Sequence, residues 1–295
     1  MSRYKLRANY DIENIDSQKM DGTVIVDVPM LSNGELNYGL SHIKKKLYEE
    51  NVYPSEIGFD IMSLATMVYM ADTRIERVVH GQDSWTREIE LEIPVSNVEI
   101  WDSQIHTVER MLKFLTGDLW KITLSSRAWQ FNNLEEVREK SNKYDEVSLF
   151  SGGMDSLIST INLMENKKNT LLISHAGEGL TKNAQKNIVN KFDLLYPDVL
   201  HTWLDLWMVF PRDYIPAGGN DNNTRSRSFL FIGYALFAMT GMDNINELLV
   251  PENGLIALNV PLDETRVGSF STRTTHPFYL SLWNELLVGL GLNLS

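Results

Sequence analysis

The chain has 295 residues, of which 43% are hydrophobic, so it is long enough to bury the core of one large or two ordinary domains. It contains no cysteine, which excludes disulfides, cysteine-ligated zinc and a catalytic thiol. The net charge of -12 argues against nucleic acid as a ligand. No apolar run reaches about 18 residues, which predicts no membrane span, and no apolar leader begins the chain, which predicts no secretory signal. A cytoplasmic location is therefore expected.

The first half of the chain mixes helical and strand patterns without a regular alternation. Ser55 begins a long apolar segment with helical spacing, which indicates a capped and largely buried helix. These patterns predict an N-terminal α+β domain over residues 1–140, whose role the sequence leaves open. The expected elements are a helix at 55–72, a strand at 85–95 with one wet face, a helix at 104–115, a strand at 119–124, and a connecting helix or linker at 132–146.

In residues 141–295, short apolar runs alternate regularly with helical segments. Such near-continuous apolar strands are typical of a parallel sheet that is covered by helices on both faces. The second half is therefore predicted to be a doubly wound α/β domain, whose ligands bind at the carboxyl ends of the strands. The expected strands are 146–150, 170–174, 199–206 and 246–251, and the expected helices are 154–166, 180–197 and 226–241.

The stretch SGGMDS follows the first of these strands and opens the first helix. Gly152 and Gly153 let the backbone approach a ligand closely, and the amides of the helix start, with the hydroxyls of Ser151 and Ser156, favour an anion. The carboxylate of Asp155 would repel phosphate unless Mg²⁺ lay between them. The stretch therefore predicts a site for ATP and Mg²⁺, with Asp155 as the metal ligand. A tight turn that binds nothing is the alternative.

The pattern S-G-G-x-D-S after a strand resembles the PP-loop of the ATP pyrophosphatase superfamily, whereas the Walker loop is absent. The resemblance covers about half of the chain, from residue 145 to the end. It implies an α/β fold of the adenine nucleotide alpha hydrolase-like kind and an enzyme that splits ATP into AMP and pyrophosphate. Such enzymes attach AMP to a substrate oxygen, which a nitrogen or sulfur nucleophile then displaces. Because no cysteine is present, an amine is the expected nucleophile.

Later segments resemble QueC-like (7-cyano-7-deazaguanine synthase-like) proteins of bacterial anti-phage systems, of the Qat and type IV CBASS kinds. Arg227 and Ser228 stand where the synthases have an Arg-Asn pair. Residues 251–277 resemble a loop of the defence proteins. Parts of the first half of the chain resemble the N-terminal extension of the same proteins. The resemblance implies adenylation of a 7-deazaguanine carboxylate and its transfer to an amine, including that of a protein acceptor from the same defence operon.

The chain departs from the synthases at its C-terminal end. The family synthases hold zinc through four cysteines, so zinc is not expected in this chain. Its last residues, LLVGLGLNLS, are expected to lie inside a helix, which suggests either a truncated domain or a zinc-free branch.

Candidate residues outside the loop follow strand ends and helix starts. Ser174 and His175 end the second strand, where the adenine sits in PP-loop folds; a pair that merely caps the loop is the alternative. Arg225 and Arg227 precede an apolar helix and could clamp phosphate or the substrate carboxylate through their planar guanidinium groups, and we expect Arg227 to act in catalysis with Asp155. Salt bridges within this acidic chain would explain the two arginines almost as well.

Two further groups are expected to contact the substrate. Glu252 and Asn253 follow a strand and could pair with a purine edge, although an ordinary Asn-Gly turn is a rival explanation. A polar cluster without periodicity is expected to form a loop over the site; its members are Arg266, Ser269, Thr272, Arg273, Thr274 and His276.

Two other functions remain open. A PP-loop ligase that modifies tRNA would need a basic groove, which the charge of -12 disfavours. A non-catalytic nucleotide-binding scaffold would use the N-terminal domain to dock a partner. A homodimer is compatible with either function.

Overall fold

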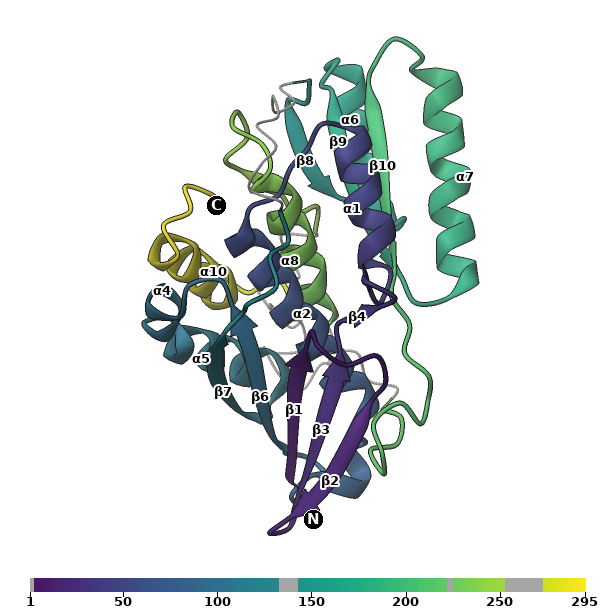
Figure 1. The fold of residues 1–295 in the computed structure, drawn as a ribbon. Coiled ribbons are helices and arrows are strands. Elements are labelled where there is room, and N and C mark those ends of the chain that lie inside the picture. Colours follow the sequence, from purple (N-terminus) through teal and green to yellow (C-terminus); the bar gives the residue numbers. More distant parts are fainter. Residues whose placement is uncertain (1–2, 133–142, 222–224, 253–272) are drawn as a thin grey trace.

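The computed structural model describes residues 3–132, 143–221, 225–252 and 273–295, and Figure 1 shows its arrangement. Two sheets lie at opposite ends of the molecule, and helices α2 and α8 run between them. Within the described ranges, no helix combines the length and the apolar composition that crossing a membrane requires.

The first sheet is formed by the N-terminal half and is mostly parallel. Its strand order is β2-β3-β1-β6-β7, and β2 alone runs antiparallel to its neighbour. The sequence patterns predicted β6 and β7, but they did not predict β1 to β3 or the parallel pairing. The strands are β1 (Arg3–Asn9), β2 (Asp16–Met20), β3 (Thr23–Pro29), β6 (Glu88–Val95) and β7 (Leu119–Ser126), and a small hairpin joins β4 (Leu31–Ser32) to β5 (Glu35–Leu36).

The two faces of this sheet differ in polarity because charged and apolar residues alternate along β1 and β6. Helices α2 and α5 cover the apolar face, on which Leu6 and Leu91 are fully buried. On the other face Lys5 pairs with Glu90 and Glu92. The helices of this half are α1 (Leu40–Glu49), α2 (Glu56–Arg74), α3 (Arg77–His80), α4 (Val98–Asp102) and α5 (Ile105–Thr116).

The second sheet is entirely parallel, with the order β10-β9-β8-β11, which confirms the predicted parallel α/β arrangement. Phe150 and Leu172 pack with α7 on one face, whereas Val147 and Leu171 belong to the core that includes α8 on the other. The strands are β8 (Glu146–Leu149), β9 (Thr170–Ala176), β10 (His201–Trp207) and β11 (Leu248–Leu249), and the helices are α6 (Met154–Glu165), α7 (Gly179–Leu195), α8 (Arg227–Met239) and α10 (Pro277–Gly289).

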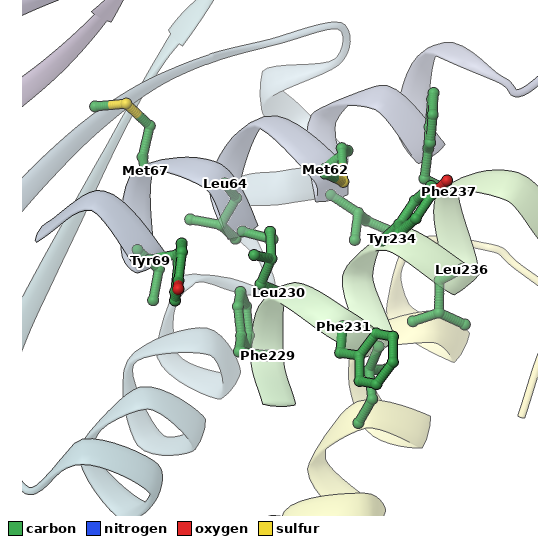
Figure 2. Packing of buried hydrophobic residues seen from close by; sticks show 14 of the residues in the cluster. Met62, Leu64, Met67, Tyr69, Phe229, Leu230, Phe231, Tyr234, Leu236 and Phe237 are labelled. Carbon is green, nitrogen blue, oxygen red and sulfur yellow. The ribbon is translucent and has the colours of Figure 1, made fainter. Parts of the chain in front are cut away.

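Helices α2 and α8 join the two halves in one hydrophobic core. A Cβ placed on Gly233 of α8 would lie 3.0 Å from the Cβ of Ala65 in the middle of α2. The amide of Ser226, at the start of α8, donates to Asp72 near the end of α2. Because the start of one helix meets the end of the other, the two helices run antiparallel. Figure 2 shows side chains of both helices meeting along this contact. The predicted cap of α2 is confirmed, because the Ser55 hydroxyl accepts the amide of Gly58. The predicted linker lies largely at 133–142, outside the described residues.

The prediction that the chain ends inside a helix is wrong. Helix α10 ends at Gly289, and Gly291 then takes a left-handed conformation with φ +72°. The amide of Leu292 donates to the carbonyl of Leu287 at 2.9 Å, and that of Gly291 donates to Val288 at 3.0 Å, which are the bonds of a Schellman helix end. Beyond it, Ser295 exchanges backbone hydrogen bonds with residues 246 and 248.

A buried ion cluster of Asp72, Arg77, Arg87 and Asp118 ties the end of α2 to the first sheet. The Arg87 guanidinium donates to Asp72 at 2.6 Å and to Asp118 at 2.7 Å, and all four residues are at most 5% exposed. Burial opposes ionisation of Asp118, but its bonds with Arg87 and Arg77 outweigh that effect and lower the pKa of its carboxyl group. Asp118 is therefore ionised at neutral pH.

Replacing one acid of this cluster should destabilise the fold strongly. Asp118→Asn removes a carboxylate that accepts hydrogen bonds from both buried guanidinium groups, and it leaves them only Asp72 and the more distant Asp221. We expect the free energy of unfolding to fall by about 3 kcal/mol. Asp27→Asn is the matched control, because Asp27 pairs with Arg7 at a partly exposed position and should cost less than about 1 kcal/mol. Urea denaturation measures both, and equal losses in the two variants would contradict the prediction.

Candidate functional site

The SGGMDS loop lies at the carboxyl end of β8 and turns directly into α6. Gly152 has a φ of +81°, a conformation that strains residues with a side chain. The two serines fold back onto the loop: the amide of Gly152 donates to Ser156 Oγ, and the amide of Gly153 donates to Ser151 Oγ, both at 3.2 Å. The local sequence therefore produces a tight turn whose hydroxyl groups already point at its own backbone.

The start of α6 offers unpaired hydrogen-bond donors. No side chain caps this helix, and the amides of residues 154–156 have no acceptor among the described residues. These amides carry the positive end of the helix dipole, which attracts anions. The side chain of Asp155 is exposed beside them.

A second carboxylate lies near Asp155. Strand β11 runs parallel to β8, with Leu249 opposite Ser148, so Glu252 follows at the level of the loop. Although Glu252 is exposed overall, partial burial of its carboxyl group raises its pKa, and the nearby charge of Asp155 raises it further. In the described part of the chain, no group of three or more acidic or histidine side chains could hold a metal ion. At the loop, the candidate metal ligands are therefore the two carboxylates of Asp155 and Glu252.

A cavity of about 500 Å³ opens beside the loop, at the carboxyl ends of β9 and β10. The sequence-predicted residues His175 and Arg227 line it, at the end of β9 and the start of α8. The first half of the chain also contributes, through Tyr69, Thr73 and Arg74 on the last turns of α2. The remaining lining residues are Gly177, Glu178, Thr181, Met208, Val209, Phe210, Asn220 and Asp221.

His175 is a neutral residue of this cavity wall. It is 1% exposed, and burial lowers its pKa to about 4, helped by the positive charge of Arg227. Its Nε2 lies 3.4 Å from the carbonyl oxygen of Met208, which can only accept, so Nε2 carries the proton. Nδ1 is then a lone-pair acceptor, and it has no partner among the described residues.

Gln185 of α7, which is not among the residues predicted from the sequence, connects the loop with the cavity. Its Nε2 lies 3.1 Å from the carbonyl oxygen of Ser151 and 3.4 Å from that of His175. Its Cγ would lie 2.9 Å from a Cβ on Gly152, so this side chain fills the space that the glycine leaves. One signal could have found it: Gln185 is a polar residue on the stripe of α7 that also buries Val189 and Phe192.

The structure does not bring Arg225 and Arg273 into the cavity. Arg225 donates to the carbonyl oxygen of Thr116 at 2.7 Å, and Arg273 donates to that of Phe114 at 2.8 Å. Both carbonyls belong to the last turn of α5, where the helix dipole favours cations. The two arginines thus complete the end of a helix that lies far from them in the sequence.

The other candidates have structural contacts or lie outside the described residues. The hydroxyl of Ser174 is buried and donates to the carbonyl of Phe150 at 2.6 Å, which is the loop-capping alternative. His276 caps α10, since its Nδ1 accepts the amide of Phe278 at 3.1 Å. The candidates outside the described residues are Asn253, Arg266, Ser269 and Thr272.

No protein-family model, curated protein or solved structure matches the chain. The loop, the carboxylate pair and the cavity are therefore the features that bear on the function.

Stability should depend on pH through His175. Between its folded pKa of about 4 and the ordinary value of 6.5, the unfolded chain binds a proton that the folded chain does not, so stability falls as the pH drops. From pH 7 to pH 5 the expected loss is about 2 kcal/mol. Urea denaturation of His175→Gln at both pH values should show this loss removed. His42→Gln, at an exposed histidine, is the control: it leaves His175 in place and should still lose about 2 kcal/mol between pH 7 and pH 5. If His175→Gln lost as much stability as the unchanged chain, His175 would not be the group responsible.

The conformation of Gly152 should not tolerate a side chain. Gly152→Ala forces alanine to a φ of +81° and displaces Gln185, and we expect a loss of about 1–2 kcal/mol in the free energy of unfolding. Gly179→Ala is the control, because a Cβ there meets nothing within 4 Å and alanine favours the first turn of α7. Chemical denaturation should show this control unchanged or slightly stabilised, and equal effects would argue against a strained loop.

Proposed function

We propose that the chain is an ATP-dependent, AMP-forming enzyme of the PP-loop kind. The observation that carries the proposal is a glycine turn with unpaired helix amides at the carboxyl edge of a parallel sheet, next to two exposed carboxylates. Parallel α/β sheets bind ligands at this edge, and unpaired amides at a helix start favour phosphate.

In this proposal the loop holds the phosphates of ATP. The amides of residues 154–156 donate to phosphate oxygens, and the hydroxyls of Ser151 and Ser156 turn from the loop backbone towards the ligand. The carboxylates of Asp155 and Glu252 suit Mg²⁺, which prefers carboxylate and phosphate oxygens. Mg²⁺ bound there would neutralise charge on the departing pyrophosphate. Burial and, to a smaller extent, the charge of Asp155 raise the pKa of Glu252, and such a cation would relieve the repulsion between the two carboxylates.

The proposed substrate is a 7-deazaguanine carboxylate, which follows from the QueC-like resemblance. A carboxylate oxygen attacks the α-phosphorus of ATP and pyrophosphate leaves; an amine nitrogen then attacks the carbonyl carbon, AMP leaves, and the nitrogen loses a proton. Arg227 supports this role because its guanidinium lines the cavity without a carboxylate partner in the described part of the chain. The proposed setting is cytoplasmic anti-phage defence, with an amine of a protein from the same operon as acceptor.

Pyrophosphate release tests this function. With ATP, Mg²⁺ and 7-carboxy-7-deazaguanine the chain should release pyrophosphate, and Asp155→Ala should lower the rate by at least about 100-fold, as expected for a group that stabilises charge in the transition state. Asp198→Ala is the matched control, because this exposed aspartate precedes β10 at the opposite end of the sheet.

Two results would contradict the proposal. If Asp155→Ala released pyrophosphate as fast as the unchanged chain, the loop would not be the catalytic site. If the unchanged chain bound ATP but released none with any amine or carboxylate supplied, the scaffold alternative would be favoured.

A further inference from the structure

The peptide unit between Ser151 and Gly152 decides what the loop offers to a ligand. Its N–H belongs to Gly152 and donates to Ser156 Oγ at 3.2 Å, while its carbonyl belongs to Ser151. The described residues contain no cis peptide bond, and in a trans peptide the carbonyl and the N–H point in opposite directions. Whatever holds the carbonyl of Ser151 therefore also aims the N–H of Gly152.

Gly152 by itself leaves the orientation of this peptide open. Glycine adopts positive and negative φ about equally well, so the peptide can turn over with little backbone strain. A peptide turned over in this way would present the carbonyl oxygen of Ser151 to the inside of the turn, where its partial negative charge would repel a phosphate. A contact from outside the loop is therefore needed to select one orientation.

Gln185 of α7 supplies that contact. Its side chain is fully buried, and its Nε2 lies 3.1 Å from the carbonyl oxygen of Ser151 and 3.4 Å from that of His175. An amide nitrogen carries two hydrogens, one for each carbonyl, so the two bonds together fix the plane of the amide. Arg227 donates to the same oxygen of His175 at 3.3 Å, which ties the arrangement to the start of α8.

Apolar packing alone does not account for an amide at position 185. The Oε1 atom of Gln185 is buried and has no hydrogen-bond partner among the described residues. A buried acceptor without a donor costs free energy, which an apolar side chain of similar length would avoid. The amide is therefore explained by what its two donor hydrogens hold, and one of them holds the carbonyl of Ser151.

We propose that Gln185 is a positioning residue that aims the N–H of Gly152 at a phosphate group bound in the loop. When the hydroxyl of Ser156 turns towards the ligand, the N–H of Gly152 loses its acceptor and donates to a phosphate oxygen instead, while Gln185 keeps it pointing into the turn. This donor adds to the amides of residues 154–156. That the loop holds phosphate rests on the proposed function; the orientation of the peptide does not.

Calorimetric titration of the full chain with magnesium pyrophosphate tests this role. Gln185→Met keeps the length of the side chain but removes both donors, and binding should weaken about tenfold. Thr170→Val is the matched control, because it also removes a buried donor, which bonds to the carbonyl oxygen of Lys168 at 2.9 Å at the opposite end of β9. This control should bind pyrophosphate as the unchanged chain does.

The NMR signal of the Gly152 amide proton separates positioning from a purely structural role. In the unchanged chain pyrophosphate should move this signal to higher frequency, because a charged acceptor replaces the hydroxyl of Ser156 and makes a stronger hydrogen bond. In Gln185→Met this movement should be lost, while the amide signals of residues 154–156 still respond to pyrophosphate.

Gln185→Glu is a second variant, which keeps the shape of the side chain and decides the question if Gln185→Met does not fold. Its carboxyl group has one donor when neutral and none when ionised, and the ionised group would repel both carbonyls. Burial places this ionisation above the ordinary range of a carboxyl group. The affinity for pyrophosphate, relative to that of the unchanged chain at the same pH, should therefore fall as the pH rises from about 5 to about 8.

The outcomes for this inference and for the proposed function are distinguishable. Undiminished binding by Gln185→Met, a Gly152 signal that still moves in that variant, or a pH-independent ratio in Gln185→Glu would overturn the inference alone. If the unchanged chain bound no pyrophosphate, the inference and the proposed phosphate loop would both be wrong. If it bound pyrophosphate through Gln185 but never released any from ATP, the inference would hold and the proposed activity would not.

Discussion

The close antiparallel packing of α2 against α8 is the contact on which the rest of the structure depends. Gly233 lets the two helices approach until their small residues touch, and α2 is buried between α8 and the apolar face of the first sheet. At one end of this pair the ion cluster anchors α2, with Asp72 also accepting the amide of Ser226. The same end forms a wall of the cavity. The position of α2 therefore sets both the stability of the shared core and the shape of the site.

The second sheet could be predicted from the sequence because β8 and β9 are short apolar runs and its strands alternate with helical segments. The first sheet was harder. In β1 apolar and charged residues alternate over few positions, and β2 is exposed along its length, so neither gives a strong local signal. Its parallel order depends on crossovers through α2 and α5, and such pairing between distant segments is not encoded in any short window of sequence.

The candidate site divides in the same way. The loop is a local feature, since its glycines, serines and Asp155 follow one another, and the structure places them at a strand end as expected. Tyr69 was predicted only as part of a buried helix, because periodicity shows that a helix is covered without showing which end borders a cavity. Arg225 was expected at the site because it precedes α8 directly in the sequence. Its partner is instead the end of α5, more than a hundred residues earlier in the chain.

The pairing of α2 with α8 also has a consequence for how the chain acquires its structure on the ribosome. Helix α2 is made early and the first sheet covers one of its sides, but the surface that covers its other side is made only with residues 227–239. Until then the apolar side chains on that second side stay accessible to water and to other nascent chains. Contacts between such distant segments slow folding, and exposed apolar surface favours aggregation. The order of synthesis thus leaves the α8-facing side of α2 in need of protection until residues 227–239 have been made.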